Sequence, residues 1–598
     1  MTAFAELVAA TNFSFLEGAS HGEDMIAQAV ALGHAGIGIA DRNTVAGVVR
    51  AHKALRLIRA RAIEGGFADI DFKLVVGARL VFADGTPDIV AYPTTRHGWG
   101  RLTRLLTTGN LRARKGDCIL GFGDLLRHLD DLLVIVLPAS SARPHEARDG
   151  AILPPPRADA GLDATVRGLA SAAPDRVWLG VTMPRTGRDR RRSLHHARLA
   201  QAIGVPLLAT GDALYAEPAD RPLHDVLTCI RLGTTIRSAG RRLATNGERH
   251  LKTGAEMARL FADLPQAVAE SGRILDRIAF TLTDLAYEYP HEPVPSGWAP
   301  QAWLEHITYA AARQRFPDGI PARLQKLLDE ELPLIAERQY AFYFLTVHDI
   351  VRFAREECDP PILCQGRGSA ANSAVCWLLG VTSVDPMRYD LLFSRFVSAE
   401  RDEPPDIDID FEHERREEVM QYIYRRYGRH RAAIAATVIH YRPRSAVREA
   451  GKVLGLSEDV TQRLTSTVWG SFADRFESKH LGETGFAVDN PEIARLRDTV
   501  DRLIKFPRHL SQHVGGYVLT QGRLDETVPI HHAAMADRTF IEWDKDDIDE
   551  LKIMKVDILA LGMLTCIRKA FDLMRENGLE SHDLDSIPPD DPPVYDML

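Results

Sequence analysis

The segment Asp406-Ile407-Asp408-Ile409-Asp410-Phe411 alternates acidic and apolar side chains. Because side chains repeat every two residues along a strand, this pattern predicts a β-strand with three carboxylates on one face and three apolar side chains on the other. Carboxylates two residues apart lie about 7 Å from each other and repel unless cations lie between them. Oxygen ligands on a rigid strand suit Mg²⁺, which binds one or two carboxylates together with substrate phosphates. An acidic strand edge facing solvent is the alternative interpretation.

A glycine-rich turn, Gly366-Arg367-Gly368-Ser369, lies upstream of the acidic strand, and we expect a helix to begin after it near Ala370. Glycines let the backbone approach a ligand closely, and free N–H groups at a helix N-terminus favour phosphate oxygens. The turn alone is a weak signal, because the Walker pattern with its lysine is absent. Together with the acidic strand it predicts a phosphate holder and a metal holder, the two parts of a nucleotidyl-transfer site.

Charge is strongly segregated around the acidic strand, although the whole chain is only mildly acidic. The 598 residues contain 73 Lys and Arg against 82 Asp and Glu, and this net charge of −9 excludes a globally basic nucleic-acid binder. Residues 402–414 carry seven acidic and no basic residues, whereas residues 415–452 carry nine Arg and one Lys against three Glu. Such a pair of surfaces suits an enzyme that acts on a polyanion, although a solvated helix with ion pairs explains some of the arginines.

Short apolar runs alternate with amphipathic segments up to about residue 280. We expect buried strands at residues 36–41, 72–82, 131–138, 175–183 and 205–212, which predicts an α/β layer or barrel. Helices are expected within residues 300–357, 412–428 and 441–510. Lys555 and Asp557 share one face of a further predicted strand, but nothing in the spacing brings Asp557 near Asp406.

The six cysteines include no Cys-x-x-Cys pair, which argues against a zinc ribbon and against a disulfide scaffold. The N-terminus lacks the pattern of a signal peptide, and no segment approaches the roughly 18 apolar residues of a membrane span. We therefore expect a cytoplasmic protein with reduced thiols and no contact with a membrane.

Five segments together resemble the polymerase core of the bacterial C-family DNA polymerases, the DNA polymerase III alpha-subunit family. They are GRGSAANS (366–373), PDIDIDF (405–411), YRPRSAVREAGKVLGL (441–456), HLSQHVGGYVLT (509–520) and WDKDDIDELKIMKVDILALGML (543–564). Three further segments are most similar to the error-prone DNA polymerase branch of that family: AELVAATNFSFLEGAS (5–20), RPLHDVLTCIR (221–231) and FPRHLSQHVGG (506–516). The resemblance extends over essentially the whole chain.

This resemblance implies an α/β multidomain fold. Residues 1–285 would form a β/α barrel of the polymerase-and-histidinol-phosphatase (PHP) type, and residues 286–435 and 511–562 would form two parts of an α+β palm like that of polymerase-β-type nucleotidyltransferases. Residues 436–510 would form a helical thumb, and residues 563–598 would form the start of the fingers. Because similar family members continue further, the resemblance also implies a C-terminally truncated chain whose own activity has to be measured.

The resemblance also implies roles for individual residues. Asp406, Asp408 and Asp557 would be the catalytic aspartates and would hold two Mg²⁺ ions, whereas Asp410 stays outside this trio. Gly368 and Ser369 would bind the nucleotide, and five basic residues would line the incoming triphosphate: Arg367, Arg395, Arg401, Lys545 and Lys555. DNA would contact Arg442, Arg444, Arg448 and Lys452.

The barrel departs from the metal-binding pattern of its family. Residues 7–10 lack the His-x-His of the first strand, and Arg42 follows Asp41 where histidine is common. The segment 77–79 ends in Arg79 and has no carboxylate, and Asp212 has lost the histidine that would follow it. Because two aspartates cannot hold three metal ions, we expect no metal in this domain and no metal-dependent 3′ exonuclease.

The predicted function is error-prone, DNA-directed DNA synthesis in the repair of DNA damage, by two-metal transfer of a nucleotide from dNTP to a primer 3′-hydroxyl. The resemblance implies primer–template DNA and dNTPs as substrates, with a sliding clamp and mutagenesis accessory proteins as partners. The alternatives are a replicative DNA polymerase III alpha subunit and a truncated, non-catalytic DNA-binding scaffold. The missing histidines disfavour a phosphoesterase.

Overall fold

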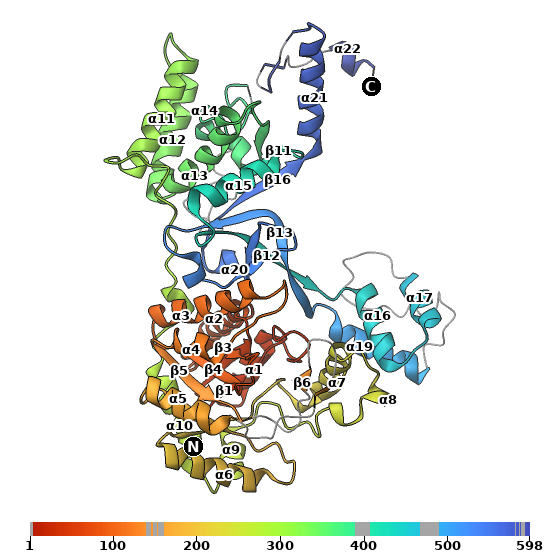
Figure 1. Cartoon of the computed structure of the whole chain (residues 1–598). Helices are drawn as coiled ribbons and strands as arrows, with labels where there is room; N and C mark the ends of the chain where they lie inside the picture. Colours follow the sequence, from red (N-terminus) through yellow and green to blue (C-terminus); the bar gives the residue numbers. More distant parts are fainter. Residues whose placement is uncertain are drawn as a thin grey trace.

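The computed structural model describes residues 4–138, 145–146, 152–153, 161–388, 407–466, 490–580, 582–584, 586–587 and 592–597. These residues form a mixed α/β structure with two seven-stranded sheets and one short pair, β6 (His145–Glu146) with β7 (Ile152–Leu153). Figure 1 shows the first sheet in an N-terminal unit at the bottom, the second sheet above it and a group of helices to one side. The mixed α/β class that the sequence predicts is confirmed.

The first sheet has the order β1 (Ala5–Ala9), β2 (Gly36–Arg42), β3 (Lys73–Leu80), β4 (Ile89–Pro93), β5 (Leu132–Val136), β8 (Val177–Val181) and β9 (Leu207–Ala209). Five of the seven strands lie where apolar runs predict them, namely β2, β3, β5, β8 and β9. After β9 the chain returns to β1, because the Ala213 N–H donates to the Val8 carbonyl and the Ala10 N–H donates to the Ala213 carbonyl, each at 2.9 Å. These bonds close the sheet into what we call the N-terminal barrel, residues 4–285.

Ten helices of the described residues belong to the N-terminal barrel. They are α1 (Gly22–Ala31), α2 (Val48–Glu64), α3 (Arg96–Arg112), α4 (Phe122–Leu126), α5 (Leu162–Ala172), α6 (Asp189–Ile203), α7 (Arg221–Arg231), α8 (Ile236–Ala239), α9 (Gly254–Leu260) and α10 (Pro265–Arg277). Helices separate β1 from β2, β2 from β3, β4 from β5 and β8 from β9, as the alternating sequence pattern predicts, whereas α7 to α10 follow the last strand in succession.

The second sheet, called here the C-terminal sheet, has the order β10 (Cys364–Arg367), β11 (Asp408–Glu412), β16 (Lys555–Leu561), β13 (Pro507–Leu519), β12 (Ala432–His440), β15 (Thr539–Ile541) and β14 (Ile530–His532). β11 is parallel to β16 and antiparallel to β10. Its associated helices are α11 (Pro300–Arg315), α12 (Ala322–Glu337), α13 (Ala341–Arg352), α14 (Ala374–Leu378), α15 (Arg416–Tyr427) and α20 (Lys545–Glu550). Ile407, Ile409 and Phe411 are fully buried beneath the sheet, which confirms the predicted apolar face of the acidic segment.

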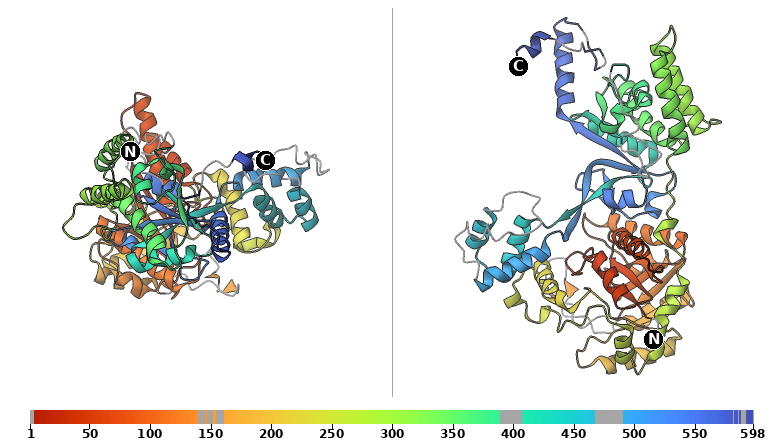
Figure 2. Two further views of the ribbon diagram at one scale, coloured as in Figure 1. Left: turned by 90° about the horizontal axis from the view of Figure 1, so that it is seen from above. Right: turned by 180° about the vertical axis from the view of Figure 1, so that it is seen from behind.

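A third group of helices, called here the helical lobe, consists of α16 (Pro443–Leu454), α17 (Glu458–Ser466) and α19 (Pro491–Leu503). β12 and β13 run as one long ribbon from the C-terminal sheet to this lobe (Figure 2). Leu223 and Leu227 of α7 pack into the same hydrophobic cluster as Val447 of α16 and Val500 of α19. The lobe is therefore attached both to the C-terminal sheet and to the N-terminal barrel.

The N-terminal barrel and the C-terminal sheet share one hydrophobic core. Trp543, which follows β15, is fully buried in the same cluster as Trp99 of α3, and their rings stack with centroids 6.5 Å apart. Ion pairs border this core, because Arg50 and Arg56 of α2 contact Asp544 at 2.6 Å and Glu550 at 2.7 Å. Such a continuous apolar contact makes the two units one packed body.

Candidate active site

Two of the three predicted catalytic aspartates lie directly opposite each other. In the parallel pair of β11 and β16, Asp408 is the register partner of Asp557. The side chains of partner residues point to the same face of a sheet, so the two carboxylates share one surface. This proximity is the link that the spacing of the sequence left open. Asp406, the third predicted ligand, lies outside the described residues.

Two basic side chains neutralise this acidic surface. Arg367 of β10 lies opposite Asp408 in the sheet and bridges two carboxylates, with Nη1 3.4 Å from Asp408 and Nε 2.9 Å from Asp410. The buried Lys555 Nζ lies 2.7 Å from Asp557 Oδ2. The cations expected between repelling carboxylates are thus supplied here in part by the chain itself.

Asp557 keeps one oxygen unused. Its Oδ1 atom is buried and has no hydrogen-bond partner among the described residues. His513 Nδ1 lies 3.9 Å from this oxygen and instead accepts the N–H of Gly516 at 2.8 Å. A side chain at position 516 would not fit, because a Cβ there would lie 2.7 Å from Asp557 Oδ1. A buried carboxylate oxygen without a donor is costly unless a cation binds it.

The donor set fits the predicted Mg²⁺ because it consists of carboxylate oxygens. Among the described residues, no three His, Cys, Asp or Glu side chains are grouped so that they could hold a metal ion. Asp408 and Asp557 supply two such side chains, and the predicted third belongs to the part of the chain that is not described. The orphaned Asp557 Oδ1 is the observation that favours a cation at this place.

The glycine-rich turn is built differently from the sequence prediction. Residues Gly368–Asn372 form a single 3₁₀ turn, and the α-helix, α14, begins only at Ala374 rather than near Ala370. Gly368 has φ +61°, a backbone conformation that glycine adopts without strain. The turn joins β10, which carries Arg367, to α14.

The first amides of α14 are not free for phosphate, contrary to the expectation. The buried Glu331 of α12 accepts the N–H groups of Ala374 and Val375 at 2.8 and 3.1 Å. It also accepts the Ser373 hydroxyl at 2.8 Å. A carboxylate satisfies helix-terminal N–H groups as a phosphate does, so Glu331 anchors the glycine-rich turn from inside the protein.

Burial raises the pKa of Glu331 from its usual 4.5 to about 7. Between pH 4.5 and 7 the folded chain therefore keeps a proton on Glu331 that the unfolded chain has released. The contribution of Glu331 to the free energy of unfolding falls as pH rises through this range, by up to about 3 kcal/mol. We expect Glu331→Gln to remove this part of the pH dependence, measured as the free energy of unfolding at pH 5 and pH 8. Glu337→Gln, at the exposed end of the same helix, should follow the wild type; an unchanged dependence in Glu331→Gln would contradict the assignment.

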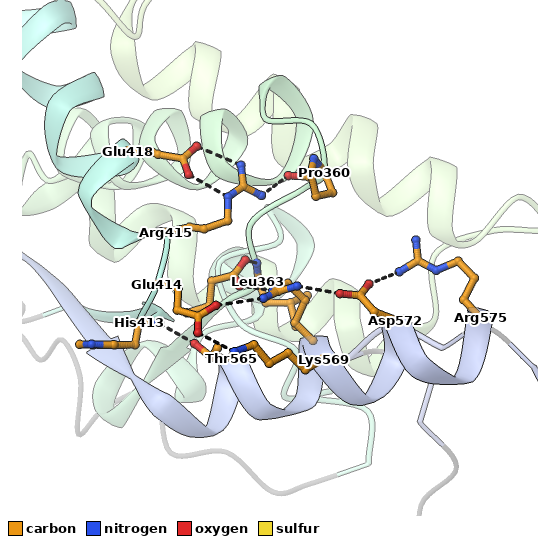
Figure 3. Close-up of polar contacts among 12 residues, drawn as sticks. Pro360, Leu363, His413, Glu414, Arg415, Glu418, Thr565, Lys569, Asp572 and Arg575 are labelled. Carbon is orange, nitrogen blue, oxygen red and sulfur yellow. Dashed lines mark hydrogen bonds and ion pairs between the residues drawn. The ribbon is translucent and has the colours of Figure 1, made fainter. Parts of the chain in front are cut away.

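A latch of ion pairs fixes the helix that follows β16. This helix, α21 (Gly562–Glu576), continues directly from the strand that carries Asp557 and stands clear of the sheet (Figure 1). The fully buried Glu412, at the end of β11, contacts Arg568 of α21 at 2.5 Å. Figure 3 shows Glu414 reaching Lys569, and the Thr565 hydroxyl accepts the His413 N–H at 2.8 Å. The latch joins the ends of both aspartate-bearing strands to one helix.

The other predicted nucleotide contacts are spread more widely. Arg395 and Arg401 lie outside the described residues, and the side chain of Ser369 is not described. Lys545 is exposed at the start of α20, the helix whose acidic residues face α2 of the N-terminal barrel. Of the five predicted basic residues, the structure places Arg367 and Lys555 beside the aspartate pair.

The basic segment 415–452 divides into structural and exposed arginines. Arg415, next to the start of α15, pairs with Glu418 of that helix, as the helix interpretation predicts. Arg431 lies beyond the helix and instead pairs with Glu292, from a segment far upstream. In α16, Arg444, Arg448 and Lys452 recur every four residues and are exposed, opposite the buried Val447. Arg442, at the start of the same helix, is exposed as well.

In the N-terminal barrel, protein groups engage the two remaining aspartates. The fully buried Asp41 accepts the N–H and the hydroxyl of Thr11, each at 2.7 Å, and the Ser14 hydroxyl at 2.6 Å. Arg79 places its guanidinium between Asp212 at 2.7 Å and Asp88 at 2.9 Å. A guanidinium thus stands at the strand position where the metal-binding pattern expects a carboxylate. The absence of a metal from this domain stays a prediction.

Sequence reasoning missed Glu331 and Glu412, which position the turn and the helix around the site. Both are acidic residues in segments where charged residues are common, and no short motif distinguishes a buried carboxylate from an exposed one.

Of the helices within the described residues, none combines the length and the apolar character that crossing a membrane requires.

Comparisons with known proteins agree with the geometry. Residues 302–560 match the family model described as "Bacterial DNA polymerase III alpha NTPase domain". Over its full length the chain is 55% identical to an error-prone DNA polymerase from Rhodopseudomonas palustris (strain BisB5), of which it covers 51%. It is 54% identical to one from Bradyrhizobium sp. (strain ORS 278), covering 49%, and 53% identical to one from Brucella melitensis biotype 1, covering 54%, again over its full length.

The chain thus spans about half the length of the curated relatives it matches. Among solved structures, an amidohydrolase from Chromobacterium violaceum aligns with 36% of this chain and 88% of its own, at 12% identity and a TM-score of 0.23. A structural similarity with so low a TM-score gives no information about the function of this chain.

Proposed function

We propose that the chain carries the catalytic centre of an error-prone DNA-directed DNA polymerase, because residues 302–560 match the model of the bacterial DNA polymerase III alpha NTPase domain and the whole chain is 55% identical to an error-prone DNA polymerase. The substrates would be primer–template DNA and dNTPs, and the setting would be the repair of damaged DNA in the cytoplasm. The similarity to error-prone relatives favours this function over a replicative alpha subunit.

The observation that carries the proposal is the pairing of Asp408 with Asp557 on adjacent strands, with one buried oxygen of Asp557 left without a donor. Asp406, Asp408 and Asp557 would hold two Mg²⁺ ions. When bound, these ions would activate the primer 3′-hydroxyl and stabilise the pyrophosphate leaving group. Arg367 and Lys555 reduce the electrostatic repulsion between the carboxylates that they contact. The same two side chains would face the incoming triphosphate.

The surrounding units fit the same proposal. The C-terminal sheet with its helices would be the palm, the helical lobe the thumb, α21 the start of the fingers, and the N-terminal barrel a PHP domain that supports the palm. The exposed stripe of Arg444, Arg448 and Lys452 on α16 would contact duplex phosphates, with Arg442 beside it. A sliding clamp and mutagenesis accessory proteins would be its protein partners.

Primer extension tests the proposal directly. The 598-residue chain, mixed with a labelled primer–template, dNTPs and Mg²⁺, is expected to add at least one templated nucleotide, and EDTA is expected to stop the addition. Filter binding of the same DNA provides the control. Binding of the DNA without any nucleotide addition would contradict the proposal and favour the non-catalytic scaffold.

A further inference from the structure

One tyrosine hydroxyl links the backbones of the two strands that carry the aspartate pair. Tyr343 belongs to α13, and its side chain is fully buried beneath the C-terminal sheet. Its hydroxyl accepts the N–H of Ile407 at 2.8 Å and donates to the carbonyl of Lys555 at 3.3 Å. A hydroxyl can accept and donate at once, so a single atom satisfies both strands.

The two linked backbone groups lie next to the aspartates. Ile407 immediately precedes Asp408, and Lys555 lies two residues before Asp557. The β11–β16 ladder begins at the pair Asp408 and Asp557, so the hydroxyl bonds to both strands just before their first paired residues. Strand ends separate more easily than strand centres, because fewer neighbouring bonds hold them.

Lys555 adds a second connection at the same place. Its carbonyl accepts the Tyr343 hydroxyl, while its Nζ contacts Asp557 Oδ2 at 2.7 Å. Tyr343 therefore holds the backbone of the same residue whose ammonium group orients Asp557. A shift of this backbone would move both the register of the strands and the direction of the carboxylate.

We propose that Tyr343 is a positioning residue, whose hydroxyl sets the spacing and orientation of Asp408 and Asp557 at the proposed metal site. The inference rests on the proposed function, because it assigns the pair a shared cation. Tyr343 itself touches neither the metal nor the substrate; it acts through the backbones of Ile407 and Lys555.

The test replaces Tyr343 by Phe in the 598-residue chain, which keeps the ring in the core and removes only the hydroxyl. Mn²⁺ binding to the chain without substrates is measured by electron paramagnetic resonance, and we expect the affinity to fall about tenfold, because the Ile407 N–H loses its buried acceptor. In primer extension, kcat is expected to fall about tenfold while KM for dNTP changes less than about twofold.

Tyr427→Phe is the matched control. Tyr427 is equally buried, and its hydroxyl donates to Asp349 at 3.0 Å, away from the two aspartate-bearing strands. Both variants should lose thermal stability, but only Tyr343→Phe should lose Mn²⁺ affinity. Amide hydrogen exchange in the metal-free chain gives a second measurement, in which Ile407 should exchange faster in Tyr343→Phe and at the wild-type rate in Tyr427→Phe.

The outcomes separate this inference from the proposed function. Equal Mn²⁺ affinity and equal kcat in the two tyrosine variants would overturn the role of Tyr343, even if both bind and extend DNA. Mn²⁺ binding by the wild type that Asp557→Asn leaves unchanged would instead overturn the proposed metal site. Loss of Mn²⁺ affinity and kcat in Tyr343→Phe alone, with Ile407 exchange accelerated, supports both.

Discussion

Asp408→Asn is expected to lower the rate of nucleotide incorporation by at least about 1000-fold, because the variant removes charge from the ion-binding pair at the point where negative charge develops. Asparagine has the same shape, and Asp408 is partly exposed at the strand end, so the fold should persist. Single-turnover primer extension measures the rate, and the melting temperature checks the fold. Binding of primer–template DNA should stay close to that of the wild type.

Asp410→Asn is the matched control for this experiment. Asp410 lies on the same face of β11 and contacts Arg367 at 2.9 Å, but it is not the register partner of Asp557. We expect its rate to stay within about tenfold of the wild type, because it holds Arg367 rather than the ions. Equal losses in the two variants would show that the acidic face acts as a whole and would contradict the special role of the Asp408 and Asp557 pair.

Trp543→Ala is expected to lower the free energy of unfolding by about 3–5 kcal/mol, because it removes a large, fully buried side chain. The side chain is fully buried where the N-terminal barrel meets the C-terminal sheet, stacks on Trp99 and donates its Nε1–H to the Val45 carbonyl at 3.4 Å. Because the two units share one core, they should unfold together in a single transition. Calorimetry with a folding-sensitive fluorescence probe measures both the cost and the number of transitions.

Trp298→Ala tests whether the effect depends on the shared core. Trp298 is 43% exposed, and its loss should cost no more than about 1 kcal/mol. Two separate transitions in the wild type, with only one shifted by Trp543→Ala, would contradict the single packed body.

The strongest sequence pattern predicted the local structure of the site well. The alternation around Asp408 placed a strand with a buried apolar face, and Lys555 to Leu559 placed another, because a period of two is set by the backbone itself. A local pattern does not determine which strands pair with each other. The contact between Asp408 and Asp557 joins segments far apart in the chain, so it required either the fold or a family resemblance.

For the glycine-rich turn, the sequence predicted the backbone turn but not the contacts of the helix that follows it. Its glycines predicted a backbone turn correctly, but the conclusion that free helix amides follow it was wrong. Glu331, from a helix far upstream, takes those amides, and nothing in the local sequence of α14 reveals it. In the same way, the pairing of Arg79 with Asp88 and Asp212 depends on how strands of the N-terminal barrel lie together, which spacing alone does not fix.

The central claim is that Asp408 and Asp557 share a divalent cation, and the position of Mn²⁺ tests it most directly. Crystals of the chain grown with primer–template DNA and Mn²⁺ give the ion position from its anomalous diffraction. We predict an anomalous peak within about 2.5 Å of carboxylate oxygens of both Asp408 and Asp557, including Oδ1 of Asp557. Mn²⁺ at the Asp41 and Asp212 end of the N-terminal barrel, with no peak between Asp408 and Asp557, would contradict the claim.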